Sequence, residues 1–305
     1  MSSTLTGGLT QWWYRHPRAM LVLLLSLPLL WLGIVYLGSL FALLVQSFFS
    51  VDEFSGVIVY ELTLDSYRQL LTPANGDVIL RTVMMALCVT LAAAIIAFPI
   101  AYVAARYARG IWRAVFYIGV MLPLWSSFLV KVYAWKLLLA KEGIFYWLLE
   151  KLHLTGLLEV ILNLPVIGGS SLSTSYIGTF LVFVYIWLPF MILPIQSALE
   201  RLPGSVLEAS ADLGAAPFVT FRHVILPLAI PGVIAGSIFT FSLTLGDYII
   251  PGIIGSSRPF IGQVVYMQQG TAGNMPLAAV FSVIPIVVMI VYLQVAKRSG
   301  AFDAL

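Results

Sequence analysis

The sequence predicts an all-α membrane protein with six transmembrane helices, and three observations lead to this fold class. Of the 305 residues, 61% are hydrophobic and only 10% are charged. The mean hydropathy is +1.00, whereas soluble domains carry about 25% charged residues and do not tolerate so much exposed apolar surface. The apolar residues also fall in long unbroken runs, which favours helices over the short alternating segments of a β-barrel.

Six runs are long enough to cross a hydrocarbon core about 30 Å thick, which takes about 20 helical residues. The first run is longer than the apolar core of a secretory signal, and no clear cleavage site follows it. We therefore expect it to remain as an anchor helix. The six expected spans are 20–49, 82–105, 114–140, 176–199, 224–246 and 276–296.

The placement of Lys and Arg predicts that both termini lie in the cytoplasm. With this orientation the inner segments hold nine basic and four acidic residues. The remainder holds seven basic and nine acidic residues, and the two groups together give the formal charge of +3. Between the spans on the outer side, turn residues and helical spacing predict four features. They are a polar loop at 50–81 with a turn at 73–76, an interfacial helix in 141–159, a loop at 163–175 and a short helix in 259–269.

Several signatures of catalysis are missing from the chain. It has no Gly-x-x-x-x-Gly-Lys-[Ser/Thr] loop for ATP, no nucleophile elbow and no His-Glu-x-x-His pair. The three histidines are isolated, and the single cysteine, Cys88, excludes a disulfide within the chain and is expected to be a small buried hydrophobe. The sequence therefore predicts neither an enzyme nor a metal or cofactor site. It indicates transport that uses energy supplied by another protein.

One polar segment, 200–227, interrupts the apolar runs on the cytoplasmic side. Ser205 and Glu208 have the spacing of a capping box, which predicts a helix that begins at Ser205 and ends before Gly214. Pro217 suits the first turn of a second short helix. Apolar residues on these helices predict a surface that docks on a partner, with packing against the chain's own bundle as the alternative. They are Val206, Leu207, Leu213, Phe218 and Phe221.

The sequence Glu208-Ala209-Ser210 is followed by Gly214 after three residues, and Gly214 by Val224-Ile-Leu-Pro after nine. This pattern resembles the EAA loop of ABC importer permeases, which reads Glu-Ala-Ala, three residues, Gly, nine residues, Ile-x-Leu-Pro. Ser210 replaces Ala and Val224 replaces Ile, while both spacings are kept. The resemblance implies that this loop couples the chain to a cytoplasmic ATPase through Ser205, Glu208, Ala209, Ser210, Asp212, Gly214, Leu226 and Pro227.

A helix-turn-helix that binds nucleic acid is another interpretation of this segment. Only Arg201 and Arg222 lie nearby, and the acidic residues outnumber them, which is the wrong charge for phosphate contacts. Apolar spans also flank the segment on both sides. We therefore expect no nucleic acid partner.

Two further stretches, 122–135 in the third span and 244–251 at the end of the fifth, are similar to polyamine-type permeases. Lys131 stands where those relatives usually have Arg, which keeps the charge but loses the bidentate fork. The resemblance runs from about residue 21 onward and implies the type I (MetI-like) ABC importer permease fold. It divides the chain into 1–80, with the N-terminal cytoplasmic segment, the first helix and a periplasmic loop; 81–298, a five-helix core with the coupling loop at 200–227; and 299–305, a cytoplasmic tail.

The resemblance also implies a function and a set of partners. The chain would be the permease subunit of an ATP-driven importer of polyamines such as putrescine, in a bacterial inner membrane, and would provide half of the translocation pathway. Its partners would be a second homologous permease, a cytoplasmic ATPase dimer that binds the ATP, a periplasmic binding protein and membrane lipid. The alternatives are an importer of another small organic solute, such as an opine or a modified amine, an ion-gradient-driven carrier, and a membrane scaffold.

Asp247 is the main candidate for a substrate contact. An acidic group costs about 2.5–3.5 kcal/mol at mid-bilayer, so acids in spans are usually functional. Asp247 would attract a cationic amine, and aromatic faces would bind the same charge. A structural pair with Lys131, or an acid that snorkels to the interface, is the alternative. The expected pathway residues are Asp247, Tyr248, Trp125, Tyr133, Trp135, Trp187 and Lys131.

Overall fold

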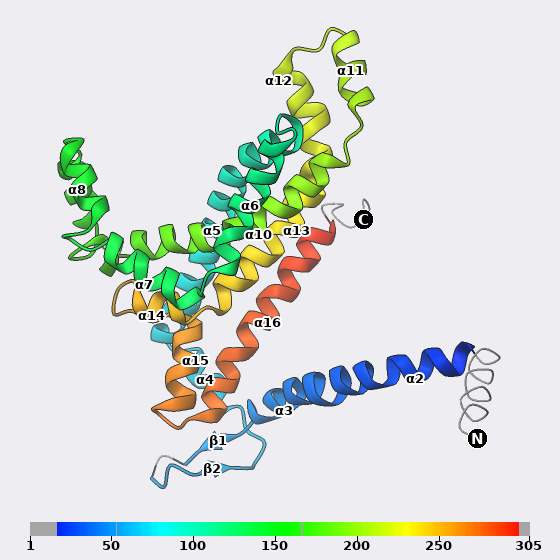
Figure 1. Cartoon of the computed structure of the whole chain (residues 1–305). Helices are drawn as coiled ribbons and strands as arrows, with labels where there is room; N and C mark the ends of the chain where they lie inside the picture. The colour runs from blue at the N-terminus through cyan, green and yellow to red at the C-terminus, as the bar shows by residue number, and fades with distance from the viewer. Residues whose placement is uncertain (1–16, 53, 166, 299–305) are drawn as a thin grey trace, which may run out of the picture.

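Three long helices lie together at the centre of the structure: α5 (Pro73–Arg106), α10 (Tyr176–Glu200) and α13 (Leu226–Gly246). A fourth, α16 (Met275–Arg298), packs against α13 (Figure 1). The computed structural model describes residues 17–52, 54–165 and 167–298. Residues 1–16 and 299–305 lie outside this described part of the chain. The predictions of cytoplasmic termini and of the tail 299–305 fall on these residues.

The expected third span, 114–140, is not one helix. It consists of α6 (Ile111–Trp125) and α7 (Phe128–Leu138), which meet at an angle of 95°. Pro123 has no N–H to continue the helical hydrogen bonds, and Ser126 and Ser127 are extended, with ψ of 150° and 131°. The prediction of a continuous helix is therefore wrong. The described residues contain five single-helix candidate spans, and six if the bent pair crosses as one.

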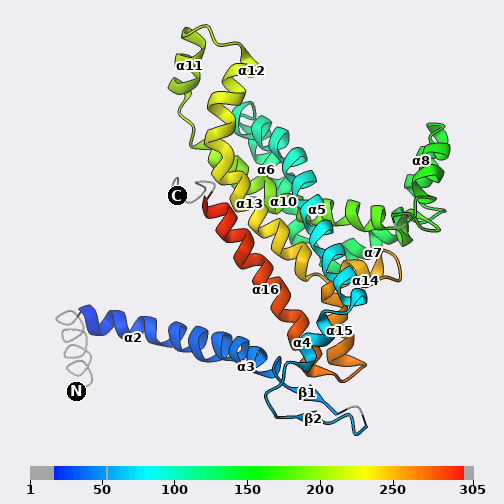
Figure 2. The ribbon, with the colours of Figure 1, turned by 180° about the vertical axis from the view of Figure 1, so that it is seen from behind.

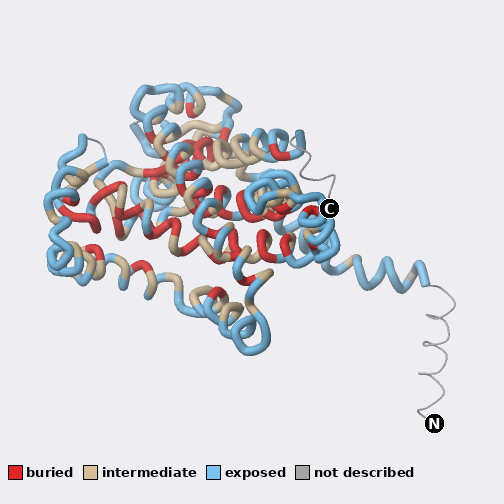
Figure 3. The backbone as a smooth tube through the Cα atoms, turned by 90° about the horizontal axis from the view of Figure 1, so that it is seen from above, coloured by how far each residue is buried: buried red, intermediate tan, exposed pale blue. Residues whose placement is uncertain are grey.

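The first span stands away from the bundle (Figures 1 and 2). A π-helical segment, η1 (Trp31–Leu37), joins α2 (Pro17–Leu30) to α3 (Gly38–Gln46). No residue in its most apolar window is buried, and Figure 3 shows the helix outside the region where buried residues gather. So large an apolar surface needs lipid or another protein around it, as in a membrane-embedded subunit.

The expected polar loop 50–81 contains regular structure. β1 (Ser50–Val51) pairs with β2 (Ile58–Val59) as a two-stranded antiparallel hairpin, and α4 (Asp65–Leu70) follows. The expected turn at 73–76 is wrong, because these residues form the first turn of α5. Proline suits the start of a helix, since the N–H that it lacks has no helical partner there.

Several of the segments that connect the long helices also form short helices. The expected interfacial helix 141–159 is in fact two helices, α8 (Ile144–Lys151) and α9 (Thr155–Leu162), with His153 between them at a positive φ of 56°. Figure 1 shows α8 far from the central helices. The short helix expected in 259–269 is confirmed as α15 (Ile261–Gly270). The others are η2 (Leu172–Thr174), within the expected loop 163–175, and α14 (Ile249–Ile253), just after α13.

Helices α10 and α13 approach each other closely at two glycines. A Cβ atom at Gly232 would lie 2.6 Å from the carbonyl oxygen of Pro194, and one at Gly236 would lie 2.8 Å from the sulfur of Met191. Glycines four residues apart let membrane helices touch through their backbones, where van der Waals packing supplies the attraction. The buried residues of α10 then form the centre of two apolar clusters, an outer one around Phe183 and an inner one around Ile195.

We expect Gly232→Leu to destabilise the bundle by about 1–3 kcal/mol, because the added side chain must displace the backbone of α10. Thermal unfolding of the purified chain in detergent measures the effect as a lower midpoint. Gly119→Leu is the matched control, since Gly119 also lies within a helix and a Cβ atom there has no neighbour within 4 Å. The same midpoint for both variants would contradict the close packing.

Candidate functional site

Residues 200–227 form an arm that extends beyond the ends of the central helices (Figure 1). α11 (Gly204–Asp212) leads to α12 (Pro217–Thr220), in which Pro217 takes the first position as expected. The π-helical segment η3 (Phe221–Ile225) then joins α12 to α13. The expected second short helix is therefore continuous with the fifth span, so a displacement of the arm acts directly on that span.

The start of α11 differs from the prediction. Its N-cap is Pro203, which is extended (φ −63°, ψ 137°), and no side chain caps the helix. Because the helix begins at Gly204, the backbone of Ser205 is already helical, and the predicted capping box of Ser205 with Glu208 is wrong. The proline fixes the extended geometry that a capping side chain would otherwise stabilise.

The end of α11 agrees with the prediction. Gly214 has a positive φ of 75°. Its N–H donates to the carbonyl of Ala211 at 2.8 Å, and the N–H of Ala215 donates to the carbonyl of Ser210 at 3.1 Å. These two bonds form a Schellman motif, in which glycine accepts the left-handed backbone without strain. The turn between α11 and α12 is thus a defined structure with its own hydrogen bonds.

The polar side of α11 is open to a partner. Ser210 is the exception: it is buried, and its hydroxyl lies 2.8 Å from that of Thr220, which ties α11 to α12. Of the other expected coupling residues, Leu226 is half-buried. The exposed ones are Ser205, Glu208, Ala209, Asp212, Gly214 and Pro227.

The apolar residues of the arm fall into two groups. Leu207 and Phe221 pack against the inner cluster. For these two residues the alternative prediction holds, in which the arm packs against the chain's own bundle. Leu213 and Phe218 are 88% and 70% exposed, and Val206 is also exposed. The outer surface of the arm therefore combines a carboxylate face with large apolar side chains, which is the composition of a docking surface.

At the opposite end of the fifth span, Asp247 caps a helix. Its Oδ1 accepts the backbone N–H groups of Ile249 at 2.7 Å and Ile250 at 2.8 Å, at the start of α14. Lys131 donates from Nζ to the carbonyl of Pro123 at 2.6 Å, across the bend between α6 and α7. No ion pair joins Asp247 to Lys131 in the described part of the chain, so the structure does not form the pair that the sequence offered as an alternative.

Tyr248, next to Asp247, forms an aromatic pair that the sequence did not reveal. Its ring stacks on that of Tyr266 from α15, with centroids 5.1 Å apart and planes 12° apart. Both rings are exposed, and cavities of about 310 Å³ and about 280 Å³ border them. Gln269 lines the first cavity and Gln263 the second. In the sequence, Tyr266 is an aromatic residue on a short polar helix, and this pattern does not predict which residue its ring would contact.

The other expected pathway residues do not join this pair. Trp135 packs between Phe145 and Tyr185, with centroid distances of 5.5 and 4.9 Å. Trp187 is buried and stacks on Phe128 at 5.9 Å. Trp125 and Tyr133 are largely exposed. Among the described residues, no ring contact or hydrogen bond connects these four side chains to Asp247 or Tyr248.

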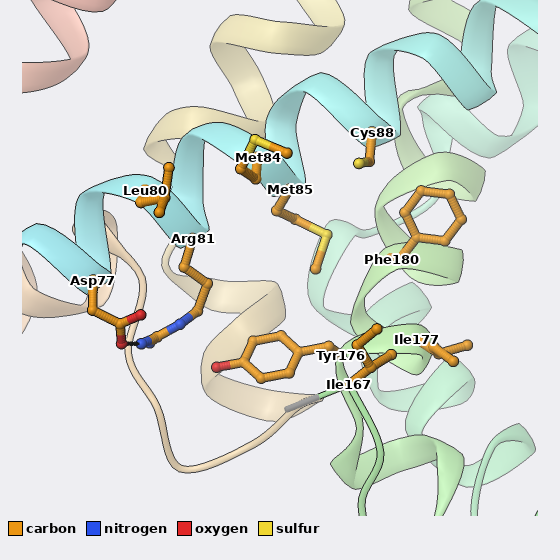
Figure 4. Close-up of a pocket in the computed structure, with 10 residues that line it drawn as sticks. All are labelled: Asp77, Leu80, Arg81, Met84, Met85, Cys88, Ile167, Tyr176, Ile177 and Phe180. Atoms are coloured by element: carbon orange, nitrogen blue, oxygen red, sulfur yellow. Dashed lines mark hydrogen bonds and ion pairs between the residues drawn. The ribbon is translucent and has the colours of Figure 1, made fainter. Parts of the chain in front are cut away.

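An apolar cavity of about 530 Å³ lies between α5 and α10 (Figure 4). At its mouth, Arg81 forms an ion pair with Asp77, donates to the carbonyl of Pro259 at 2.9 Å and lies over the ring of Tyr176. Its wall includes Cys88, which is exposed. The expectation of a buried cysteine is therefore wrong, because the side chain faces this gap and not the alanine-rich buried face of α5. The apolar wall does not suit a hydrophilic solute.

No group of three or more His, Cys, Asp or Glu side chains that could hold a metal occurs among the described residues. A bundle of spans with a structured arm between two of them defines a membrane-embedded transport subunit. The chain belongs to the family of binding-protein-dependent transport system inner membrane components, whose family profile matches residues 93–299.

Individual relatives extend this match over almost the whole chain. The chain is 58% identical to the inner membrane ABC transporter permease protein YdcU of Escherichia coli (strain K12), over 98% of this chain and 96% of that one. It is 32% identical to the spermidine/putrescine transport system permease protein PotB of the same organism, over 83% and 88%. A chain of the bacterial alginate ABC transporter has the same fold, with a TM-score of 0.72 at 14% identity, over 96% and 98%.

These findings confirm the expected permease fold and the coarser part of the functional prediction. The chain is a multi-pass inner membrane permease subunit of an ABC importer that works with a periplasmic binding protein and an ATPase. Such a subunit is not an enzyme and needs no cofactor of its own. A carrier that works alone on an ion gradient and a scaffold without a pathway do not agree with this family.

Proposed function

We propose that the importer carries polyamines such as putrescine, and that this chain forms half of the pathway together with a second homologous permease. The observation that carries the proposal is the similarity to PotB, whose name gives spermidine and putrescine as its cargo, over 83% of this chain. The relative at 58% identity has no cargo in its name. The substrate must therefore be argued from the residues of the site.

The outer end of α13 supports a cationic cargo. Both backbone bonds to Asp247 fall on Oδ1, and its charge lies next to the exposed ring of Tyr248 and the ring of Tyr266 stacked on it. A carboxylate and aromatic faces are the groups that bind an ammonium ion, with cation–π contacts of about 0.5–2 kcal/mol. A flexible diamine fits such a place, because it needs charge and stacking surface but no fixed shape.

One observation favours the second candidate, a different small organic solute. The ammonium group of Lys131 is bound to a carbonyl oxygen, and no acid neutralises it in the described structure. A free positive charge beside the pathway would repel a dication, whereas it would tolerate a zwitterionic opine or another modified amine. Competition among these solutes for uptake separates the two candidates.

We also propose that the arm 200–227 lies in the cytoplasm, as both termini do, and couples the chain to the ATPase dimer. ATP closes the dimer, the arm moves with it, and the two permeases change from inward-facing to outward-facing; hydrolysis resets them. The Schellman turn at Gly214 and the bond between Ser210 and Thr220 support this role, because they make the arm a stiff lever. Leu213 and Phe218 offer the apolar contact.

We expect Glu208→Lys and Gly214→Pro to abolish ATP-driven uptake without removing the chain from the membrane. The first reverses the charge of the docking face, and the second places a residue fixed at φ near −65° where the backbone has φ 75°. Uptake into proteoliposomes that contain the complete complex measures activity, and immunoblotting measures the membrane content. Glu61→Lys is the matched control, since it reverses an exposed acid far from the arm. Normal uptake by both arm variants would refute the coupling role.

We expect Asp247→Asn to reduce the uptake of labelled putrescine by about ten-fold, which corresponds to about 1.4 kcal/mol of lost attraction. Asparagine keeps the oxygen that caps α14, so the change isolates the charge. Uptake kinetics at saturating loaded binding protein measure the effect.

Two tyrosine variants at the same place test the aromatic face. Tyr248→Leu should also reduce uptake, whereas Tyr248→Phe keeps the ring and should not. Unchanged kinetics for Asp247→Asn, or competition by an opine but not by putrescine, would contradict the polyamine proposal.

A further inference from the structure

Glu200 is the last residue of α10, immediately before the arm, and three side chains converge on one of its oxygens. Its Oε1 accepts the hydroxyl of Tyr117 at 2.7 Å, Nη2 of Arg113 at 3.0 Å and Nε2 of Gln196 at 3.1 Å. Three donors on one carboxylate oxygen are far more than an exposed surface acid normally has. The side chain of Glu200 is 25% exposed, although the residue as a whole lies at the surface, so the three donors cover most of the carboxylate side chain.

Two of the three donors come from α6. Arg113 and Tyr117 are four residues apart and therefore lie on the same face of that helix, with the guanidinium 6.0 Å from the tyrosine ring centroid. Within the described part of the chain, the side-chain hydrogen bonds and ion pairs that α6 donates to another helix, those of Tyr117 and Arg113, both end on Glu200. Much of the remaining surface of α6 is exposed and apolar. Glu200 is therefore the polar contact of the α6 side chains with α10. The Pro123 carbonyl of α6 also accepts Lys131 of α7, and Phe116 and Val120 pack against the apolar cluster around Ile195.

The same carboxylate lies close to the coupling helix. Only residues 201–203 separate Glu200 from the start of α11, and the carbonyl of Leu202 accepts Nη2 of Arg106, at the end of α5, at 3.2 Å. A cavity of about 430 Å³ lies beside this connection, bordered by Pro194 and Pro231. The base of the arm thus has a tight connection to α5 and α6 and free space next to it, which allows a displacement.

Contacts lead from α6, across the bend, to the outer half of the chain. It runs to the 95° bend, where Lys131 bridges back to Pro123. Beyond the bend, Phe128 stacks on Trp187, and Val132 belongs to the same apolar cluster as Ile250 of α14. The residue after Tyr248 begins α14. A chain of contacts therefore leads from the arm, through Glu200 and the bent span, to the outer end of the fifth span.

We propose that Glu200 is a positioning residue that transmits the movement of α11 to the bent span α6–α7 by way of Arg113 and Tyr117. The proposal rests on the coupling role of the arm stated above. In this proposal the carboxylate of Glu200 connects the arm, which contacts the ATPase, with the helices beyond the bend. Glu200 is not part of the sequence motif that predicted the coupling role of the arm.

The test measures the mobility of the bend between α6 and α7 directly, so its result does not depend on which solute the importer carries. In a Cys88→Ser background, a nitroxide on Ser127→Cys reports the mobility of the exposed bend in the complete complex, reconstituted with its ATPase and binding protein. Electron paramagnetic resonance spectra are compared without nucleotide and after trapping with ATP and vanadate. With the native carboxylate contact we expect a clear spectral change. In Arg113→Ala and in Glu200→Gln the change should fall at least about five-fold, the lower range of coupling between distant sites.

Controls separate transmission from simple loss of stability. Arg109→Ala also removes an arginine near the start of α6, but Arg109 is exposed and its side chain forms no hydrogen bond or ion pair with the described residues, so the spectral change should persist. The charge exchange Arg113→Glu with Glu200→Arg restores the ion pair and should restore the change, while an equal membrane content of all the variants excludes loss of the fold as the cause. The number of solute molecules taken up per ATP hydrolysed should fall and recover in parallel.

The outcomes also separate this proposal from the coupling role itself. If Glu208→Lys removes the spectral change while Arg113→Ala and Glu200→Gln keep it, the arm couples but Glu200 does not transmit. If Glu208→Lys keeps the change as well, the coupling role of the arm is wrong. An identical bend spectrum with and without nucleotide in the unaltered complex, or no recovery in the charge exchange, would overturn the transmission by Glu200.

Discussion

A hydrocarbon environment obliges every backbone N–H and C=O to find a partner within the protein, and this constraint shapes the whole structure. Helical segments satisfy it with their own hydrogen bonds. Where the chain leaves the helix, a side chain supplies the missing partner. Lys131 covers the carbonyl of Pro123 at the bend, and Asp247 takes two N–H groups at the start of α14. The irregular positions of the backbone are consequently the positions that carry polar side chains, and the two charged candidates for the pathway are both of this kind.

Helix α10 is the element that the other helices depend on, because it is the most enclosed of the spans: 61% of its apolar window is buried. Its middle meets α13 at Gly232 and Gly236, where the backbones touch. Its outer end meets α5 through the guanidinium of Arg81 over Tyr176, and its inner end meets α6 through Glu200. Contacts at both ends and in the middle thus connect α10 to α5, α13 and α6.

The length of an apolar run is a local property, and for this reason the sequence predicted five of the six expected spans as single helices. The turn at Gly214 and the start at Pro217 were also predictable, since left-handed backbone and a missing N–H belong to single residues. The bend in the third span was not, because Ser126 and Ser127 hardly interrupt an apolar run. Tyr266 and Glu200 were missed for a different reason. Their partners are distant in sequence, and only the crossing of helices brings them together.

Two acids, Asp247 at the end of α13 and Glu200 at the end of α10, differ in the origin of their hydrogen bonds. Asp247 receives its hydrogen bonds from backbone N–H groups two and three residues further along, so its position is set locally. Glu200 receives two of its three hydrogen bonds from another helix, α6, so its carboxylate connects α10 to α6. The connection of α6 does not rest on Glu200 alone, because Phe116 and Val120 of α6 also pack against the apolar cluster around Ile195. The same chemical group therefore caps a helix at one position and connects two helices at the other, and the origin of its hydrogen bonds decides which.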